Sequence, residues 1–332
     1  MYHKAFGIME TLAPLHVGAS AGEESGNLNL IFRDQFTQTG IVPGSSIRGR
    51  FRADMRQKRM WWLEDELQKQ GVIIPDAEVQ KIELTVSDPK TTISRLEWLE
   101  LEAKKKSLVV PRSIDENYWY GHHAIAGDKD GGTTEALVKF EYASLVWIPV
   151  FCPGQPIVWV SCPRLLKRYK QVTGLDLPIP KPTAAGAYPV RLSKHQNRLF
   201  FSLGFLDNLV KTPTLIDWVP EGSQVEPDNL VVVADDDMAI IHDMALYRQT
   251  RTKLEDNVKK VDNFFGFEAL PEDCILVFPV AIRKMNDKAI DGKWKPLKES
   301  RQDLYFGGLE SVGCGRASVE LGGEYFEDGS SL

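Results

Sequence analysis

The run LYFGGLESVGCGRASVEL, residues 304–321, places four glycines within nine residues and then continues as a segment of β-strand type. Glycines gathered this closely indicate a backbone that takes positive φ angles or approaches another group closely. The spacing does not match the G-x-G-x-x-G pattern of a dinucleotide site, and no helix is expected after it, so the sequence disfavours a Rossmann-type site. Two interpretations stay open: a loop that approaches a ligand, and a tight hairpin that binds nothing.

A second feature is the run TGIVPGSSIRGRFRADMRQKRMWWLEDELQKQ, residues 39–70. Two serines, Ser45 and Ser46, follow a Pro-Gly pair, and either can cap a helix by accepting a hydrogen bond from an exposed backbone N–H. The expected helix has an apolar stripe and an adjacent basic stripe, formed by Ile47, Phe51 and Met55 and by Arg48, Arg52, Arg56 and Arg59. The basic stripe predicts a cationic binding surface; the alternative is a solvated face with no ligand.

Charge is segregated along the chain, whose net charge is −6. Residues 45–60 contain six bases and one acid, whereas residues 221–237 contain six acids and no base. Because contacts to phosphate are local, an acidic protein can still bind nucleic acid through one basic surface. The asymmetry predicts two different surfaces.

The remaining sequence predicts an α+β fold. Apolar and β-branched segments at 5–19, 136–154, 155–163 and 274–282 are typical of strands, and LNLIFRD, residues 28–34, is expected to be extended. Helices are expected over RLLKRYKQVTG and in the second half of NLVVVADDDMAIIHDMAL, joined by a proline-rich connector at 175–190. Strands and helices in this mixed order, with hairpins, favour a ferredoxin-like core over a doubly wound parallel sheet.

The composition is that of a globular protein, with 43% hydrophobic and 26% charged residues. We expect one domain, residues 1–332, with an insertion at 60–135 where regular patterns are weak. The four cysteines form no C-x-x-C pair and, with the six histidines, offer no zinc spacing. No stretch is long and apolar enough for a membrane span or a signal peptide, so the chain is expected to be cytoplasmic, with no membrane partner.

Several motifs together resemble the RAMP superfamily of CRISPR proteins. The pattern G-G-x-x-x-x-G-x-G-R before a strand is similar to the signature loop of that superfamily. LHVGA, RD and IVPGSSIRGRFR resemble elements of the backbone subunits of type III effector complexes, and WVSCPRLLKRYK and LVVVADDDM are similar to segments of the Cmr-branch backbone subunit. Residues 60–130 have no counterpart in this resemblance.

The resemblance implies a ferredoxin-like (RRM-like) palm with finger and thumb elements, the thumb at 244–270. It also implies a ribonucleoprotein of antiviral defence, in which such subunits stack along a guide RNA with target RNA and other effector subunits as partners. Phosphate contacts of this kind position RNA without reading its sequence. The implied guide-RNA contacts are His16, Ser45, Ser46, Arg48, Arg52, Gly313, Gly315 and Arg316.

Whether the subunit cuts target RNA is a separate question. Family members that cut use an aspartate ahead of the Arg33–Asp34 position, and the family's spacing lands on Leu28, flanked by Asn27 and Asn29. Neutral asparagines are poor bases. The alternative is an endonuclease that uses a displaced acid, Asp34 or one of Glu23 and Glu24. No cofactor is expected, apart from a divalent metal should the subunit cleave.

Two other candidates have simpler interpretations. Asp235, Asp236 and Asp237 would suit a metal-dependent hydrolase, but consecutive acids before a helix usually act as caps and interact with its positive end. His122 and His123, beside Trp119 and Tyr120, would suit stacking on bases, and a solvent-facing aromatic loop or a packing surface between subunits explains them equally well.

Overall fold

The computed structural model describes residues 1–18, 28–76, 81–84, 91–122, 133–153, 157–187, 198–254, 261–284 and 293–327. The chain divides into two compact units. The first comprises residues 1–47, 139–282 and 299–332, and the second comprises residues 48–138 and 283–298. The second unit therefore includes the segment predicted as an insertion, 60–135, together with most of the preceding basic helix and a short later segment.

The first unit is built on an eleven-stranded sheet. Nine strands form its main path, in the order β12 (Val210–Lys211), β9 (Ala184–Ala185), β13 (Leu230–Val232), β8 (Val158–Ser161), β7 (Ala143–Val150), β16 (Ile275–Arg283), β1 (Tyr2–Thr11), β18 (Arg316–Gly322) and β17 (Arg301–Tyr305). Two further strands, β3 (Ile41–Val42) and β6 (Val138–Phe140), pair with β7 and β16. The central pairs β1–β18, β7–β16 and β7–β8 are antiparallel. This sheet with its helices confirms the α+β fold.

The strands follow the sequence pattern that predicted them. β7 and β8 are buried along almost their whole length, as their continuous apolar runs require when both faces of a strand are covered. β1 alternates between buried and partly exposed residues before it becomes fully buried. Trp147 lies in the main core, where its indole N–H donates to the carbonyl of Trp218 at 3.0 Å.

Two helices of the first unit also begin and end where the sequence indicates. α4 (Pro163–Thr173) has proline in its first turn and ends before Gly174, which takes the left-handed conformation that closes helices. α5 (Asp235–Ala245) follows β13 directly. The smaller elements of this unit are η2 (Pro213–Trp218), η3 (Pro227–Asn229), η4 (Glu310–Val312), α6 (Glu324–Glu327) and the hairpin of β10 (Leu199–Phe201) and β11 (Gly204–Leu206).

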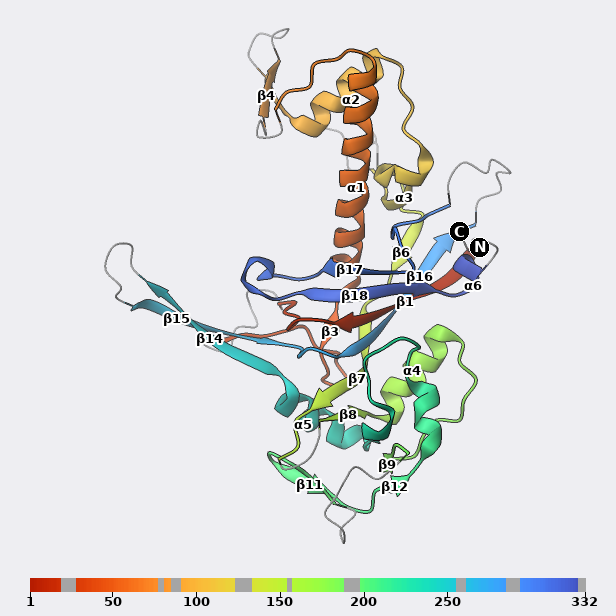
Figure 1. Cartoon of the computed structure of the whole chain (residues 1–332), viewed down its shortest axis with the longest axis vertical. Coiled ribbons are helices and arrows are strands. Elements are labelled where there is room, and N and C mark those ends of the chain that lie inside the picture. The colour runs from red at the N-terminus through yellow and green to blue at the C-terminus, as the bar shows by residue number, and fades with distance from the viewer. Residues whose placement is uncertain are drawn as a thin grey trace. The chain divides into compact units, whose positions relative to one another are not determined.

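A long hairpin occupies the segment predicted as a thumb. β14 (Tyr247–Leu254) and β15 (Val261–Ala269) pair in antiparallel fashion, and the short β2 (Leu28–Asn29) adds to β15 in parallel. Figure 1 shows the hairpin extending away from the central sheet of this unit. Its base therefore belongs to the body of the unit, whereas its far end does not.

The second unit contains most of the long basic helix α1 (Gly44–Lys69). The prediction that Ser45 or Ser46 caps this helix is wrong, because the helix begins at Gly44 and both serines lie inside its first turn. The other elements of this unit are β4 (Lys81–Leu84), β5 (Thr91–Ser94), α2 (Arg95–Lys105), η1 (Arg112–Ile114) and α3 (Glu116–Tyr120). Leu63 and Leu67 of α1 pack against Leu99 and Ala103 of α2 in a small separate core. Ser94 and Glu97 form a reciprocal capping box at the start of α2.

Among the described residues, no helix combines the length and the apolar character that crossing a membrane requires.

Candidate nucleic-acid interface

The glycine-rich loop between β17 and β18 is held against the segment that follows β1. Gly308 N–H donates to the carbonyl of His16 at 3.0 Å, and Gly315 N–H donates to the carbonyl of Pro14 at 2.9 Å. A Cβ atom on Gly307 would lie 2.1 Å from the His16 carbonyl oxygen, and Gly307, Gly313 and Gly315 all have positive φ. Gly307 and Gly315 are thus required by close contacts within the chain and Gly313 by its positive φ, whereas a Cβ on Gly308 would meet open space. The spacing of the glycines alone therefore does not require a ligand.

His16 is buried beneath this loop. Its Nδ1 lies 2.7 Å from the carbonyl oxygen of Glu268 in β15, and its ring meets Phe267 edge to face. The side chain is 8% exposed. His16 therefore joins the segment after β1 to the base of the hairpin, and its predicted contact with guide RNA stays a prediction.

Two arginines lie beside the loop: Arg316 is exposed and Arg251 is partly exposed. Arg316 begins β18 and forms an ion pair with Asp303, whose proximity raises the pKa of the guanidinium. Arg251 of β14 lies over the ring of Phe267 at 5.0 Å and donates to the carbonyl of Val312 at 3.3 Å. The hairpin, the glycine loop and the His16 segment therefore meet around Phe267. Arg251 was not among the residues predicted from the sequence, although a basic residue in an aromatic hairpin is a usable signal.

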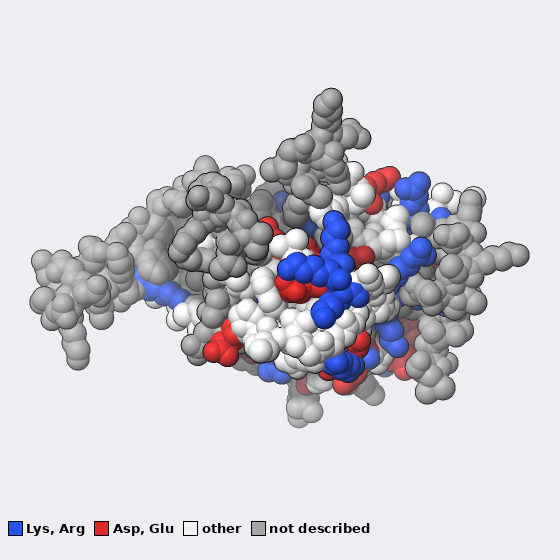
Figure 2. Space-filling model, turned by 90° about the horizontal axis from the view of Figure 1, so that it is seen from above, with Lys and Arg blue, Asp and Glu red and all other residues white. Residues whose placement is uncertain are grey.

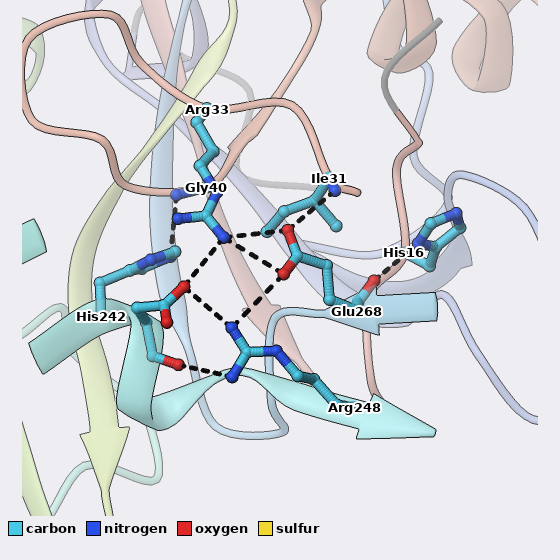
Figure 3. Close-up of polar contacts among 8 residues, drawn as sticks. His16, Ile31, Arg33, Gly40, His242, Arg248 and Glu268 are labelled. Carbon is cyan, nitrogen blue, oxygen red and sulfur yellow. Dashed lines mark hydrogen bonds and ion pairs between the residues drawn. The ribbon is translucent and has the colours of Figure 1, made fainter. Parts of the chain in front are cut away.

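A network of charged residues fixes the other side of the hairpin base (Figure 3). The Glu268 carboxylate is almost fully buried and accepts hydrogen bonds from Arg33 at 3.0 Å and from the Ile31 backbone at 3.2 Å. Arg33 also contacts Asp243 at 3.2 Å, and Arg248 reaches the same Asp243 oxygen at 2.8 Å. Buried carboxylates require such partners, because desolvation of an unpaired charge is very costly.

His242 completes this network (Figure 3) as a neutral acceptor. Its Nε2 accepts a hydrogen bond from Gly40 N–H at 2.9 Å. Burial, together with the charge of Arg33, lowers the pKa of this histidine to about 3. The loop between Arg33 and Gly40 is therefore fixed at both ends, by the ion pairs of Arg33 and by the hydrogen bond of Gly40 to His242.

Asp34, the alternative catalytic acid, has a structural role in that loop. One of its oxygens accepts hydrogen bonds from Phe36 N–H at 3.0 Å, Thr37 N–H at 2.8 Å and the Thr37 hydroxyl at 3.0 Å. Burial raises the pKa of this carboxyl, but the hydrogen bonds lower it by more, so the pKa lies below its ordinary value. An acid with a lowered pKa and an engaged oxygen is a poor general base. Leu28, on which the family's spacing was predicted to place the catalytic residue, lies in β2 opposite Gly266 of β15. Asn27, Glu23 and Glu24 lie outside the described residues.

The basic stripe of α1 is largely turned into the second unit. Arg52 and Arg59 are 7% and 6% exposed, so the expectation of a fully solvent-facing stripe is wrong for these two residues. Arg59 forms an ion pair with the buried Glu116 of α3 at 2.7 Å. Arg48 donates to the carbonyl of Tyr120 at the end of that helix. Burial raises the pKa of Glu116 and lowers that of Arg52.

At the start of the same helix, Ser45 is exposed and Ser46 is half-buried, both within the first unit.

The face of the molecule in Figure 2 carries lysines and arginines beside acidic residues, so on that face positive charge is interrupted by negative charge. The predicted contacts of Ser45 and Ser46 with guide RNA stay predictions.

The two remaining candidates have structural explanations. The prediction that Asp235 caps its own helix is wrong, because Ala234 is the N-cap residue. Asp235 instead accepts a hydrogen bond from Arg164 N–H at 2.9 Å, at the start of α4. No cluster of three or more metal-ligating side chains occurs in the part of the chain that the structure describes. Trp119 and Tyr120 are buried, so a solvent-facing aromatic loop is wrong for these two; His123 lies outside the described residues.

Comparison with known proteins extends over nearly the whole chain. The family model of the RAMP superfamily matches residues 8–318. No curated protein matches. Similar solved structures include the type III-B Cmr-beta complex in its apo state, with a TM-score of 0.58, 14% identity and coverage of 97% of this chain and 98% of that chain.

Two further structures match over the same share of this chain. The type III-B Cmr-beta complex bound to cognate target RNA gives a TM-score of 0.56 at 15% identity, covering 97% of this chain and 98% of that chain. Oligomeric Cmr4 from Pyrococcus furiosus gives 0.53 at 16% identity, covering 97% and 99%. At these identities, the likeness establishes a shared fold.

Proposed function

The chain belongs to the RAMP superfamily, and from this premise we propose that it is a guide-RNA-binding backbone subunit of a type III CRISPR ribonucleoprotein. In this role it acts in the cytoplasm, in antiviral defence directed at RNA. Its partners are the guide RNA, the target RNA and other effector subunits. The structures of similar fold include one complex bound to target RNA and one oligomeric subunit, which supports both kinds of partner.

The observation that carries the proposal is the junction around Phe267. There the glycine loop, the His16 segment and the hairpin base are joined by contacts within the first unit, and Arg251 and Arg316 lie at its exposed edge. A rigid backbone loop flanked by arginines suits phosphate contacts, which hold RNA irrespective of its sequence. We assign the primary guide contact to this junction.

The hairpin β14–β15 takes the role of a thumb in this proposal. It extends from the junction, so it can reach an RNA bound there and interrupt the pairing of guide and target (Figure 1). The charged network of Glu268, Arg33 and Arg248 at its base supplies the rigidity that this role needs.

The subunit binds RNA in this proposal without cutting it. Leu28 stands at the position of the family's catalytic aspartate, and Asp34 is engaged in the turn of its own loop. Neither residue is suited to deprotonating a 2′-hydroxyl. A displaced-acid endonuclease therefore lacks a supporting observation among the described residues.

Copurification tests the proposal directly. The chain, produced together with its neighbouring effector subunits, should be recovered with short RNA of uniform length, which sequencing would identify as guide RNA. The RNA should dissociate at high salt, because neutralised phosphates release counterions. A complex that assembles with its partners but contains no nucleic acid would contradict the proposal.

A further inference from the structure

We propose that the first unit has a second RNA site, a pocket beside α4 that accepts one unpaired nucleotide. The pocket is lined by Asp34, Phe36, Tyr142, Arg164, Lys167 and Arg168 among other residues, and we call it the α4 pocket. Its volume is about 560 Å³, within the range of about 300–1,000 Å³ typical of small-ligand sites. None of its lining residues is among the guide contacts implied by the family resemblance.

The cations of the pocket are available for a ligand. Arg164 and Lys167 project from the first two turns of α4 and are exposed, and neither forms an ion pair with a carboxylate in the described parts of the chain. Arg168 is held in place by the Ser144 hydroxyl at 2.9 Å and by the exposed Glu141 at 3.4 Å. Arg168, which is held in place, and Arg164 and Lys167, which form no ion pair among the described residues, together suit a phosphate group.

The pocket also has aromatic surfaces paired with its arginines. Arg164 lies over the ring of Phe36 at 4.8 Å, and Arg168 lies over the ring of Tyr142 at 4.2 Å. Phe36 is 72% exposed, so its ring is open to a ligand on the side that Arg164 does not cover. Exposed aromatic rings and guanidinium planes are the groups on which unpaired bases stack.

The two acids of the pocket limit the negative charge that a ligand can bring into it. Asp34 accepts backbone hydrogen bonds from its own turn, and Asp235 accepts one from Arg164 N–H, so both carboxylates stay in the lining. A segment with several carboxylates would meet these two negative charges at close range. A single phosphodiester with a stacked base uses the cations and rings while adding only one negative charge.

This inference rests on the proposed function for its ligand class, and it adds a site that holds an unpaired nucleotide of guide or target. The test uses the purified complex with its bound guide and a fluorescent oligouridylate of about ten nucleotides, a length that matches single-strand site sizes. The test variants are Arg164→Gln with Lys167→Gln, and Phe36→Ala. Lys4→Gln with Lys104→Gln is the matched control, since it removes the same charge from exposed positions outside the pocket.

We expect each test variant to weaken binding of the oligouridylate by about fivefold or more, with about twofold at most in the control. Bound guide and melting temperature should stay unchanged in all variants. Ultraviolet crosslinking should attach RNA to peptides containing Phe36 or Tyr142. The sequence of the crosslinked RNA distinguishes guide from added strand, and either source supports the inference.

Unchanged oligouridylate affinity in both test variants would overturn the inference. Loss of subunit association with unchanged RNA affinity would also overturn it, in favour of a protein contact. A wild-type complex without guide that still binds oligouridylate through Phe36 and Arg164 would support the α4 pocket while contradicting the proposed function. The two failures are therefore distinguishable.

Discussion

At the scale of single residues, His242 shows how one side chain ties stability to pH. Its ring is buried, its Nε2 accepts from Gly40 N–H, and its pKa is lowered to about 3, mainly by burial. Protonation of Nε2 would replace the acceptor that Gly40 requires with a second donor. The folded protein therefore holds this histidine neutral.

We expect acidification from about pH 7 to about pH 5 to reduce the free energy of unfolding by about 2 kcal/mol through His242. The unfolded chain binds a proton at this residue below its ordinary pKa of 6.5, whereas the folded chain does not until about pH 3. The contribution is therefore complete above the unfolded pKa and is lost as pH falls. Urea unfolding across this range measures it.

The control for this prediction is a pair of substitutions. His242→Gln removes the titrating group and keeps an acceptor for Gly40, so its stability should vary less with pH. His122→Gln alters an exposed histidine of the second unit and should leave the pH dependence unchanged. The same pH slope in His242→Gln as in the wild type would show that another group is responsible.

Asp34 gives a second prediction at this scale. Asp34→Ala should lower the free energy of unfolding by about 1–2 kcal/mol, because the Phe36 and Thr37 donors lose their acceptor. The target-RNA fragments produced by the assembled complex should stay the same. Urea unfolding and fragment mapping measure the two effects, with the exposed neighbour Gln35→Ala as control. A cut opposite this subunit that disappears only in Asp34→Ala would show catalysis by this acid.

The sequence identified the residues of this region unevenly, for a physical reason. Arg33 and Asp34 stand out as an adjacent pair, and His16 as part of LHVGA. Glu268, the centre of the charged network, was missed because its partner Arg33 lies 235 residues away. A pairing between such distant residues depends on the β15 register, which a local pattern does not specify.

At the scale of elements, α1 shows which features the periodicity of the sequence can predict and which it cannot. The spacing predicted a helix in this segment and its buried apolar stripe, but Arg52 and Arg59 of the basic stripe are buried as well. It could not predict that the short α3 would supply Glu116 as a buried partner for the basic stripe. The same limit explains why two-residue strands such as β9 and β12 were not predicted: each exists only through pairing with distant strands.

Arg59→Ala is the prediction that belongs to this element. The substitution leaves Glu116 buried with a weaker partner, Arg56 at 3.6 Å, so we expect a loss of about 3 kcal/mol in the free energy of unfolding. Thermal and urea unfolding of the full chain measure it. Gln57→Ala, on the exposed face of the same helix, should change stability by less than about 0.5 kcal/mol. Equal stability of the two variants would mean that the ion pair does not hold α3 to α1.

At the scale of the whole molecule, the distribution of charge matters more than its sum. The net charge of −6 would oppose binding to RNA if it were spread evenly. The first unit instead places Arg251, which is partly exposed, and Arg316, which is exposed and paired with Asp303, beside the glycine loop, while arginines such as Arg33 and Arg59 pair with buried carboxylates. The affinity for RNA should therefore depend on few residues.

The salt dependence of guide binding tests this conclusion. For single strands, each phosphate contact contributes about 0.7 to the slope of log affinity against log salt concentration. Arg251→Gln with Arg316→Gln should therefore lower the slope by about 1.4 and weaken binding most at low salt. Filter binding of guide-length RNA across a salt series measures both quantities. Lys106→Gln with Lys181→Gln removes the same charge from exposed positions outside the junction and should leave the slope unchanged. If both pairs reduce the slope equally, the long-range charge of the molecule governs binding, and the junction around Phe267 has no special role.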